Sequence, residues 1–310
     1  MENFRLRVFR AVARHLNFRM AAEELLLTQS AVTQQIKALE SELDVPLFDR
    51  AGGRVTLTPA GVILLPYADR LAALSDEARE AVSVTAGVHA GRLALGASQT
   101  IGQYLLPKLI AGFLHENPKV EITVMGGNTQ TILEALVDHR VQLCLVEGPA
   151  MRRDVRIEPF MEDHMVCVVP SDHEWADEEV DGMQLQNATL VARELGSGSR
   201  RIIEQALEKA GLDVKKLHLA MTFDSTEALL SAVEAGLGIA FVSRWAVRNQ
   251  LALGTLRLVR VRRVNLARMF SLATVAGPEP AGLAAVFRRF VLERAEELAP
   301  RATGRNASHS

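Results

Sequence analysis

The chain has 310 residues and a mass of 33.9 kDa, which suits two or three domains at roughly 100–200 residues each. Apolar residues make up 48%, charged residues 23%, and the formal net charge is −2; this excludes wholesale disorder and offers no global charge argument for a polyanionic partner. With two cysteines, no membrane-length apolar run and no apolar signal core at the N-terminus, we expect a cytoplasmic protein without a disulfide framework or membrane association.

Residues 1–58 predict three short helices followed by a hairpin. The apolar positions of the first helix recur at helical spacing, at Leu6, Phe9, Val12, Ala13 and Leu16. Asn17 and Thr28 are expected N-caps of the second and third helices, and Pro46 ends the third. A glycine turn at 51–53 and β-propensity at 55–57 follow. Three short helices and a hairpin within residues 1–58 indicate a winged helix-turn-helix.

The polar side of the third predicted helix is suited to duplex DNA. It carries Gln29, Ser30, Thr33, Gln34 and Lys37. Amide and hydroxyl side chains at a helix N-terminus can reach base edges in the major groove, and a lysine can pair with a phosphate. Arg50 and Arg54 of the predicted wing would hold the adjacent backbone or minor groove. The alternative is a helical protein-binding module with solvated arginines.

Charge in this region is segregated along the sequence. The arginines precede residue 20 or lie in the wing, whereas the acids gather in the second helix and at the end of the third. We therefore expect a segregated surface, modest non-specific affinity for DNA, and specificity that rests on base contacts and on assembly.

Residues 59–86 predict one long helix within a linker that extends to residue 90. Leu64, Leu71 and Ala78 recur every seven residues, as do Leu74 and Ala81, which is typical of a helical pairing seam. Pro66 interrupts the pattern and predicts a kink or a late start. The alternative is a helix lying on its own domain; pairing is favoured because the seam must be buried somewhere.

Residues 91–300 alternate between strand and helix patterns. The expected strands are 93–96, 120–125, 142–147, 166–170, 189–193, 217–221 and 239–242, and the expected helices are 101–116, 129–139, 199–210 and 226–235. This order predicts α/β architecture with mostly parallel sheets. A weak repeat of 129–146 at 225–242 favours two similar lobes with a cleft between them, and the polar segment 301–310 is expected to be disordered.

Four short polar segments open the predicted helices. Their candidate ligand-contacting residues are Ser98, Gln99, Thr100, Asn128, Thr129, Ser197 and Ser225. Helix N-termini at the carboxyl ends of strands suit small anions, although each segment could be only an N-cap. Glu147 ends a strand and should face the cleft, where it would pair with Arg193 or Arg200, bind a ligand amine or hydroxyl, or form a purely structural ion pair.

Signals for catalysis and cofactors are missing from the sequence. No phosphate-binding loop, nucleophile elbow or histidine–cysteine metal spacing is present, so we expect neither an enzyme nor a cofactor other than a small-molecule effector. Cys144 and Cys167 lie in apolar strands and are expected in the core.

The segment 18–61 strongly resembles the N-terminal domain of LysR-type transcriptional regulators. The resemblance is carried by Ala21-Ala22, Thr28–Val32, Leu39-Glu40, Pro46–Phe48, Arg50 and Leu57–Gly61. The expected DNA-contacting set is Phe18, Gln29, Ser30, Ala31, Thr33, Gln34, Lys37, Arg50 and Arg54. Many members carry proline at the position of Ser30 and a basic residue at that of Gln34, which leaves base preference open.

The rest of the chain is similar to the effector domain of that family. The resemblance implies a winged helix-turn-helix at 1–58, a dimerisation helix in 59–90, and a two-lobed α/β effector domain at 91–300 that is like a periplasmic binding protein. Lobe I would be 91–164 and 268–300, with lobe II, 165–267, inserted.

The implied partners are a two-fold site on double-stranded DNA, a small anionic effector, further copies of the chain in a homodimer or homotetramer, and RNA polymerase. Stretches such as 196–201 and 225–244 look like the branch linked to sulfur or inorganic-anion metabolism. The alternative is a cytosolic small-molecule binding protein or enzyme whose N-terminal helices form an interaction module.

Overall fold

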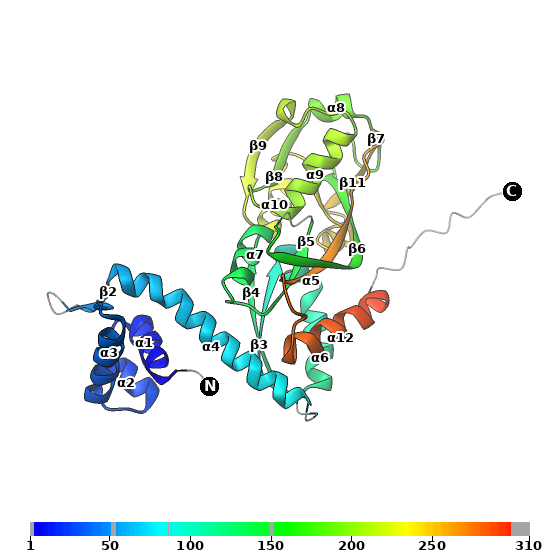
Figure 1. Ribbon diagram of the computed structural model, residues 1–310. Helices are drawn as coiled ribbons and strands as arrows, with labels where there is room; N and C mark the ends of the chain where they lie inside the picture. The colour runs from blue at the N-terminus through cyan, green and yellow to red at the C-terminus, as the bar shows by residue number, and fades with distance from the viewer. Residues whose placement is uncertain (1–2, 51–53, 86, 88, 149–151, 299–310) are drawn as a thin grey trace. The chain divides into compact units, whose positions relative to one another are not determined.

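The computed structural model describes residues 3–50, 54–85, 87, 89–148 and 152–298. The chain divides into two compact units (Figure 1): Met1–His89 with the short segments 138–140 and 281–283, and the remainder. The predicted turn at 51–53 and the predicted tail at 301–310 lie outside the described residues. Within the described ranges, no helix combines the length and the apolar character needed to cross a membrane.

The first unit contains the predicted helices and hairpin. Its elements are α1 (Phe4–His15), α2 (Phe18–Leu25), α3 (Gln29–Leu43), β1 (Phe48–Asp49), β2 (Thr56–Leu57) and α4 (Pro59–Thr85). Both predicted N-caps are confirmed, because the Asn17 side chain accepts from the amides of Arg19 and Met20 and the Thr28 hydroxyl accepts from that of Ala31. The three helices and the hairpin enclose a core that includes Phe9, Ile36 and Phe48.

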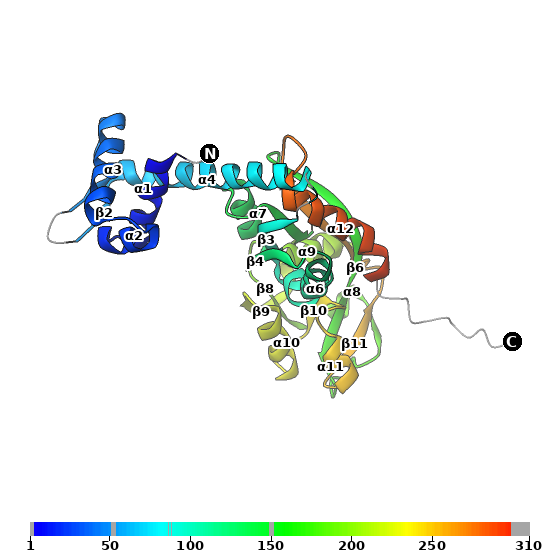
Figure 2. The same cartoon turned by 90° about the horizontal axis from the view of Figure 1, so that it is seen from below.

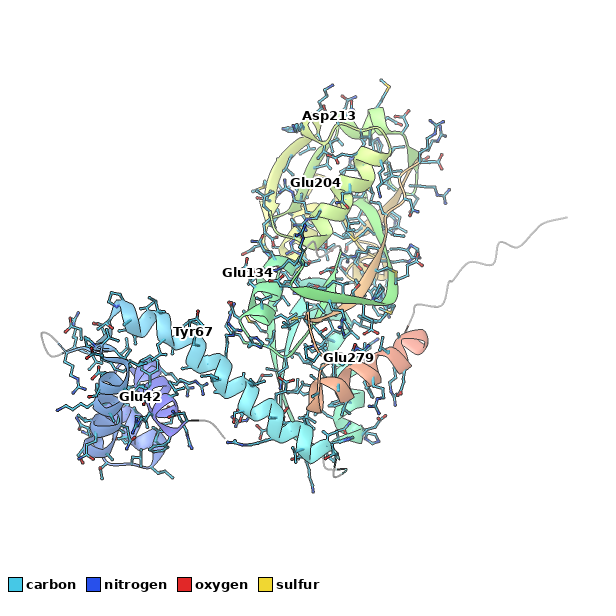
Figure 3. The ribbon with its side chains drawn as sticks, in the orientation of Figure 1. Glu42, Tyr67, Glu134, Glu204, Asp213 and Glu279 are labelled. Carbon is cyan, nitrogen blue, oxygen red and sulfur yellow. The ribbon has the colours of Figure 1, made fainter. Side chains whose placement is uncertain are left out.

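The long helix α4 begins earlier than Pro66 would suggest. The Thr58 hydroxyl accepts a hydrogen bond from the Gly61 amide, and Pro59 occupies the first helical position, where its missing N–H costs nothing. Pro66 then lies inside the helix, so the predicted late start is wrong. The seam residues Leu71 and Leu74 are 51% and 61% exposed in the single chain. Tyr67 on the same helix, labelled in Figure 3, is 58% exposed.

The second unit is built on a large mixed sheet. Its strands are β3 (Ala90–Ser98), β4 (Lys119–Gly127), β5 (Leu143–Glu147), β6 (Val155–Pro170), β7 (Glu179–Val180), β8 (Thr189–Arg193), β9 (His218–Phe223), β10 (Ala240–Ser243), β11 (Leu256–Val261) and β12 (Ala267–Val275). The sheet order is β4-β3-β5-β12-β6-β11-β7, with β10 also paired to β6, and β8 and β9 form a second sheet.

The helices of this unit cover the sheets. They are α5 (Gln99–Tyr104), α6 (Leu106–Glu116), α7 (Thr129–Val137), α8 (Gly182–Gln186), α9 (Gly198–Lys209), the 3-10 turn η2 (Val214–Lys216), α10 (Thr226–Glu234), α11 (Arg248–Leu253) and α12 (Gly282–Leu298). Helices α6 and α12 lie side by side (Figure 2), with the rings of Phe113 and Phe287 5.0 Å apart. Each copy of the weak repeat is a helix followed by a strand, α7–β5 and α10–β10.

The prediction of mostly parallel sheets is wrong for the centre of this unit. Strand β3 is parallel to β4 and β5, and β8 is parallel to β9, but β6 pairs antiparallel with β12, β10 and β11. Strand β6 also begins at Val155, well before the predicted 166, because its first part pairs with β12. Polar residues interrupt the apolar pattern of both strands, which hides them from a reading of hydrophobic runs.

Two strands carry the chain between the lobes. The first part of β6 pairs with β12, and its last part pairs with β10 and β11. With lobe I taken as 90–164 and 268–298 and lobe II as 165–267, Asp163 on β6 and Arg268 on β12 are direct register partners at this crossing. The two lobes are therefore joined beside this pair of residues.

Candidate nucleic-acid interface and ligand cleft

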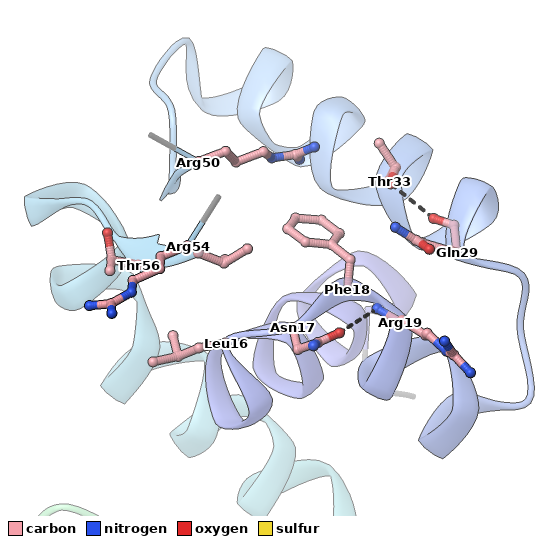
Figure 4. A pocket seen from close by; sticks show the side chains of 10 residues that line it. Leu16, Asn17, Phe18, Arg19, Gln29, Thr33, Arg50, Arg54 and Thr56 are labelled. Carbon is pink, nitrogen blue, oxygen red and sulfur yellow. Dashed lines mark hydrogen bonds between the residues drawn. The ribbon is translucent and has the colours of Figure 1, made fainter. Parts of the chain in front are cut away.

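An open groove of about 650 Å³ runs between α3 and the wing (Figure 4). Its lining residues are Leu16, Asn17, Phe18, Arg19, Gln29, Thr33, Arg50, Arg54, Val55 and Thr56. Three segments meet here because the left-handed conformation of Leu16 ends α1 and Asn17 starts α2 at once. The groove therefore joins the first turn of α3, the α1–α2 turn and the wing.

The predicted DNA-contacting residues differ in their exposure. Gln29, Ser30, Gln34, Lys37, Arg50 and Arg54 are exposed, and Ala31 and Thr33 are half-buried. The Thr33 hydroxyl donates to the carbonyl oxygen of Gln29 at 2.9 Å, which leaves its oxygen free to accept. The structure thus presents a polar face at the start of α3, as the periodicity predicts.

Phe18 is largely buried at the edge of this groove. Its side chain is 6% exposed, and its ring meets Phe48 edge-on with centroids 5.8 Å apart. The guanidinium carbon of Arg50 lies 4.1 Å from the centroid of the Phe18 ring. Phe18 therefore supports Arg50 while it also lines the groove, and its direct contact with DNA stays a prediction.

The expected segregation of charge does not persist in space. Arginines of the first two helices pair with acids, two of them distant in sequence and two closer: Arg5 with Glu42 at 2.6 Å, Arg10 with Asp69 at 2.6 Å, Arg14 with Glu24 at 2.9 Å and Arg19 with Glu23 at 3.1 Å. These pairs reduce the field that the arginines present to a polyanion. The basic residues that line the groove are Arg19, Arg50 and Arg54, and Lys37 is exposed further along α3.

In the second unit, several of the predicted ligand residues lie buried where the two lobes meet. Ser98, Thr100, Thr129, Glu147 and Ser197 are each at most 4% exposed. They come from the end of β3, the starts of α5, α7 and α9, and the end of β5. The Ser98 hydroxyl oxygen is fully buried and has no hydrogen-bond partner among the described residues, so it is the polar atom best placed for a further ligand.

The lobes touch at Gly198, the first residue of α9. A Cβ atom on Gly198 would lie 2.0 Å from the main-chain oxygen of Glu147 and 2.5 Å from the Thr129 hydroxyl oxygen. Thr129 donates to that same main-chain oxygen at 3.0 Å. The N-termini of α7 and α9 are thereby brought together at the end of β5.

Glu147 pairs with neither Arg193 nor Arg200, and of the alternatives the structure shows an ion pair within the protein. Arg193 is bonded instead to Glu194 at 2.9 Å, and Arg200 to Glu204 at 2.7 Å (Glu204 is labelled in Figure 3). Glu147 pairs with Arg268, whose Nη1 lies 2.6 Å from Glu147 Oε2. Nothing local in the sequence relates these two residues, which meet because β5 and β12 are neighbours.

Side chains also bridge the two rims of the cleft. Gln99 donates to the main-chain oxygen of Asp224 and accepts from the Thr226 amide at 3.1 Å. Asn128 donates to Glu194 at 3.1 Å. Tyr104 donates to Glu227, and burial together with this carboxylate raises the pKa of Tyr104. The cleft is therefore closed by direct contacts between the lobes.

Three of the predicted ligand residues act as helix caps, and the first is Asn128, whose side-chain oxygen accepts from the Thr131 amide at 2.9 Å at the start of α7. The Ser197 hydroxyl accepts from the Arg200 amide and the Ser225 hydroxyl from the Ala228 amide, each at 3.4 Å. Ser225 thus matches the N-cap alternative, whereas Ser197 is both a cap and a buried wall of the cleft.

The residues that sequence reasoning missed form one buried cluster at the crossing strands. Arg268 contacts Glu147, Asp163, Ser199 and Thr100, and Asp163 accepts from the Ser243 hydroxyl at 2.9 Å. Burial raises the pKa of Asp163 despite the opposing effect of Arg268. Only the pairing of β6 with β12 reveals this cluster.

Comparison with known proteins covers both units. The family model described as the LysR substrate binding domain matches residues 86–296, and that of the bacterial regulatory helix-turn-helix protein, lysR family, matches residues 4–62. A relative named "Probable RuBisCO transcriptional regulator" from Cyanophora paradoxa is 34% identical over 273 residues, which cover 87% of this chain and 84% of the relative. Because this relative belongs to a differently named group, the sulfur or anion branch stays a prediction.

Two solved structures share the fold. CbnR, solved at full length with its target DNA, has a TM-score of 0.69 at 20% identity and covers 96% of this chain and 99% of its own. The regulatory domain of CcmR from Synechocystis PCC6803, solved in complex with 2-PG, has a TM-score of 0.62 at 21% identity and covers 68% of this chain and 100% of its own.

Proposed function

The chain belongs to the LysR family of transcriptional regulators, and we propose that it reads duplex DNA through the start of α3 and is controlled by a small anion bound between its lobes. Membership of this family makes it a regulator rather than an enzyme. A cytoplasmic location and contact with RNA polymerase, which the resemblance implies, belong to the same proposal.

The observation that supports the DNA surface is the groove shared by α3 and the wing. Gln29 and Thr33 line it from the first turns of α3, and Arg50 and Arg54 line it from the wing. Polar residues on a recognition helix read base edges, while flanking guanidinium groups neutralise phosphates. CbnR provides a precedent for this fold on DNA.

A two-fold operator follows from pairing through α4. The exposed apolar residues Ile63, Leu71 and Leu74 leave a seam that a second copy of the helix would cover. Two recognition helices would then be presented to two half-sites.

The observation that supports an anionic effector is the meeting of two helix N-termini beside a buried, unpartnered hydroxyl. Helices α7 and α9 direct their N-termini toward the end of β5, where their partial positive charges add. Arg268 pairs with the carboxylate of Glu147 and so weakens the repulsion that this carboxylate exerts on an anion. The Ser98 hydroxyl supplies a hydrogen-bonding group at the same end of the sheet.

The salt dependence of binding distinguishes recognition of DNA from the alternative that the N-terminal helices bind only other proteins. Binding of the full chain to the DNA upstream of its own gene and to a scrambled duplex is measured over a range of salt concentrations. We expect tighter binding to the upstream DNA and a steep negative slope of log K against log salt. Equal binding to both duplexes would contradict sequence-specific recognition.

Ligand-dependent melting tests the effector proposal. Sulfate, inorganic phosphate and 2-PG serve as probes, and Ser98→Ala and Thr100→Ala are compared with the parent. A binding anion should raise the melting temperature of the parent, and both variants should respond less. Equal stabilisation of parent and variants by the same probe would contradict the assignment of these two residues, and no response to any probe would count against an anionic effector of this size.

A further inference from the structure

We infer that Arg268 is a positioning residue that favours closure of the lobes, and that Ser199 is its contact on lobe II. The inference rests on the proposed cleft function, because a change in closure matters only if the effector binds between the lobes. It adds to that proposal the residues that set the balance between open and closed forms.

The position of Arg268 gives it a fixed base at the crossing strands. Its Nε lies 2.7 Å from Asp163 Oδ2, and the two residues are register partners on β12 and β6. Its Nη1 lies 2.6 Å from Glu147 Oε2 at the end of β5. The Arg268 side chain has no exposed surface, so these bonds act where solvent competes least.

The same guanidinium reaches the opposite lobe. Arg268 Nη1 donates to the Ser199 hydroxyl oxygen at 2.7 Å, and the Ser199 hydroxyl lies 3.4 Å from Glu147 Oε2. Ser199 is in the first turn of α9, which belongs to lobe II. Rotation of lobe II about the crossing strands would therefore carry Ser199 away while Asp163 and Glu147 remain beside Arg268.

Loss of the Ser199 contact in the open form gives closure a specific energetic advantage. A hydrogen bond to a charged group contributes more than a neutral one, by a margin that corresponds to roughly a tenfold change in an equilibrium. A ligand shifts the equilibrium only by the difference between its affinities for the closed and open forms. The bond between Arg268 and Ser199 therefore sets how large this difference must be to close the lobes.

Ser199→Ala is the direct test because it removes the lobe II contact and leaves the pairing of Arg268 with two carboxylates intact. Ser271→Ala is the matched control: Ser271 is also a buried serine, 3% exposed, but it lies on β12 within lobe I. Arg268→Lys is a second variant, which keeps the charge and loses the planar guanidinium that contacts Asp163, Glu147, Ser199 and Thr100.

Hydrogen exchange at two amides reports closure without any effector. The Thr226 amide donates to the side chain of Gln99 on lobe I, whereas the Leu229 amide donates to the Ser225 carbonyl within lobe II. Opening exposes the first amide and leaves the second protected, and exchange detects open forms that are rarely populated.

In the full-length chain, we expect Ser199→Ala to accelerate exchange at Thr226 on the order of tenfold, with Leu229 unchanged. Arg268→Lys should act in the same direction, and Ser271→Ala should match the parent. Parent-like exchange at Thr226 in Ser199→Ala would overturn the inference. Equal acceleration at Leu229 would also overturn it, because that pattern indicates local unfolding of α10. Since no effector is added, failure of the anion proposal leaves this result unaffected.

Discussion

The guanidinium carbon of Arg50 lies 4.1 Å from the centroid of the Phe18 ring, so a residue of the wing is held against the first residue of α2. Phe18 in turn packs against Phe48 of β1. This stack connects the wing to the core of the helical unit and directs a positive charge along the groove beside α3.

Replacing Arg50 tests the wing as a phosphate contact. Arg50→Met should weaken binding to every duplex to a similar degree and reduce the magnitude of the salt slope by about 1, while the preference for the upstream DNA remains. Arg92→Met is the control, because Arg92 is an exposed arginine of β3 paired with Glu121 in the second unit. An Arg50 variant with the slope of the parent would show that this side chain does not contact phosphate.

Adding a Cβ atom at Gly198 tests whether the lobes must be closed for the effector response. The Cβ of Gly198→Ala would collide with main-chain and side-chain atoms of lobe I, so the lobes should be held apart. Thermal stabilisation by an active probe should be lost, and exchange at the Thr226 amide should be faster. Gly126→Ala, where an added Cβ meets nothing within 4 Å, should behave like the parent. A full probe response in Gly198→Ala would indicate that closure is not required.

The two cysteines should be inert in the folded chain. Cys144 and Cys167 are 0% and 2% exposed, which confirms their predicted core positions, and burial raises the pKa of the Cys167 thiol to about 12. An aromatic disulfide reagent at pH 8 should therefore titrate both thiols only after unfolding in urea. Rapid reaction of either thiol under native conditions would mean that its strand opens readily.

Asp163 should make a contribution to the free energy of unfolding that decreases as the pH rises. Because burial raises its pKa in the folded state, the carboxyl keeps its proton to a higher pH when folded than when unfolded. Its contribution is thus present at low pH and lost as the pH rises from the unfolded value, about 4, through the raised folded pKa.

The free energy of unfolding of Asp163→Asn, relative to the parent, should consequently increase with pH across that window in urea titrations. Asp154→Asn is the contrasting variant, since the neighbouring Arg152 lowers the pKa of exposed Asp154 and gives the opposite sign. A difference between Asp163→Asn and the parent that is constant with pH would contradict the assignment.

Local signals in the sequence were sufficient to predict the helices of the first unit. Asn17 and Thr28 lie where a side-chain oxygen can accept from the next turn, so the second and third helices follow from neighbouring residues alone. Short apolar runs likewise located β5 and β10, because buried strands need no alternation.

The crossing strands could not be found in this way. Asp163 and Arg268 are polar residues inside strands, and their burial is offset only by a partner 105 residues away in the chain. A long separation in the sequence also concealed Arg268 as the partner of Glu147. The charge pairs of the helical unit show the same effect, since Arg5 and Glu42 are distant in sequence and 2.6 Å apart in space.

Sequence discrimination by the double variant Gln29→Ala/Thr33→Ala measures the central claim most directly. The ratio of affinities for the upstream DNA and a scrambled duplex is compared with that of the parent and of Ser41→Ala, an exposed serine near the other end of α3. Base contacts of this kind are worth about 1–3 kcal/mol each, so the ratio should fall at least tenfold in the double variant and stay unchanged in Ser41→Ala. A double variant that discriminates as well as the parent would contradict recognition through the start of α3.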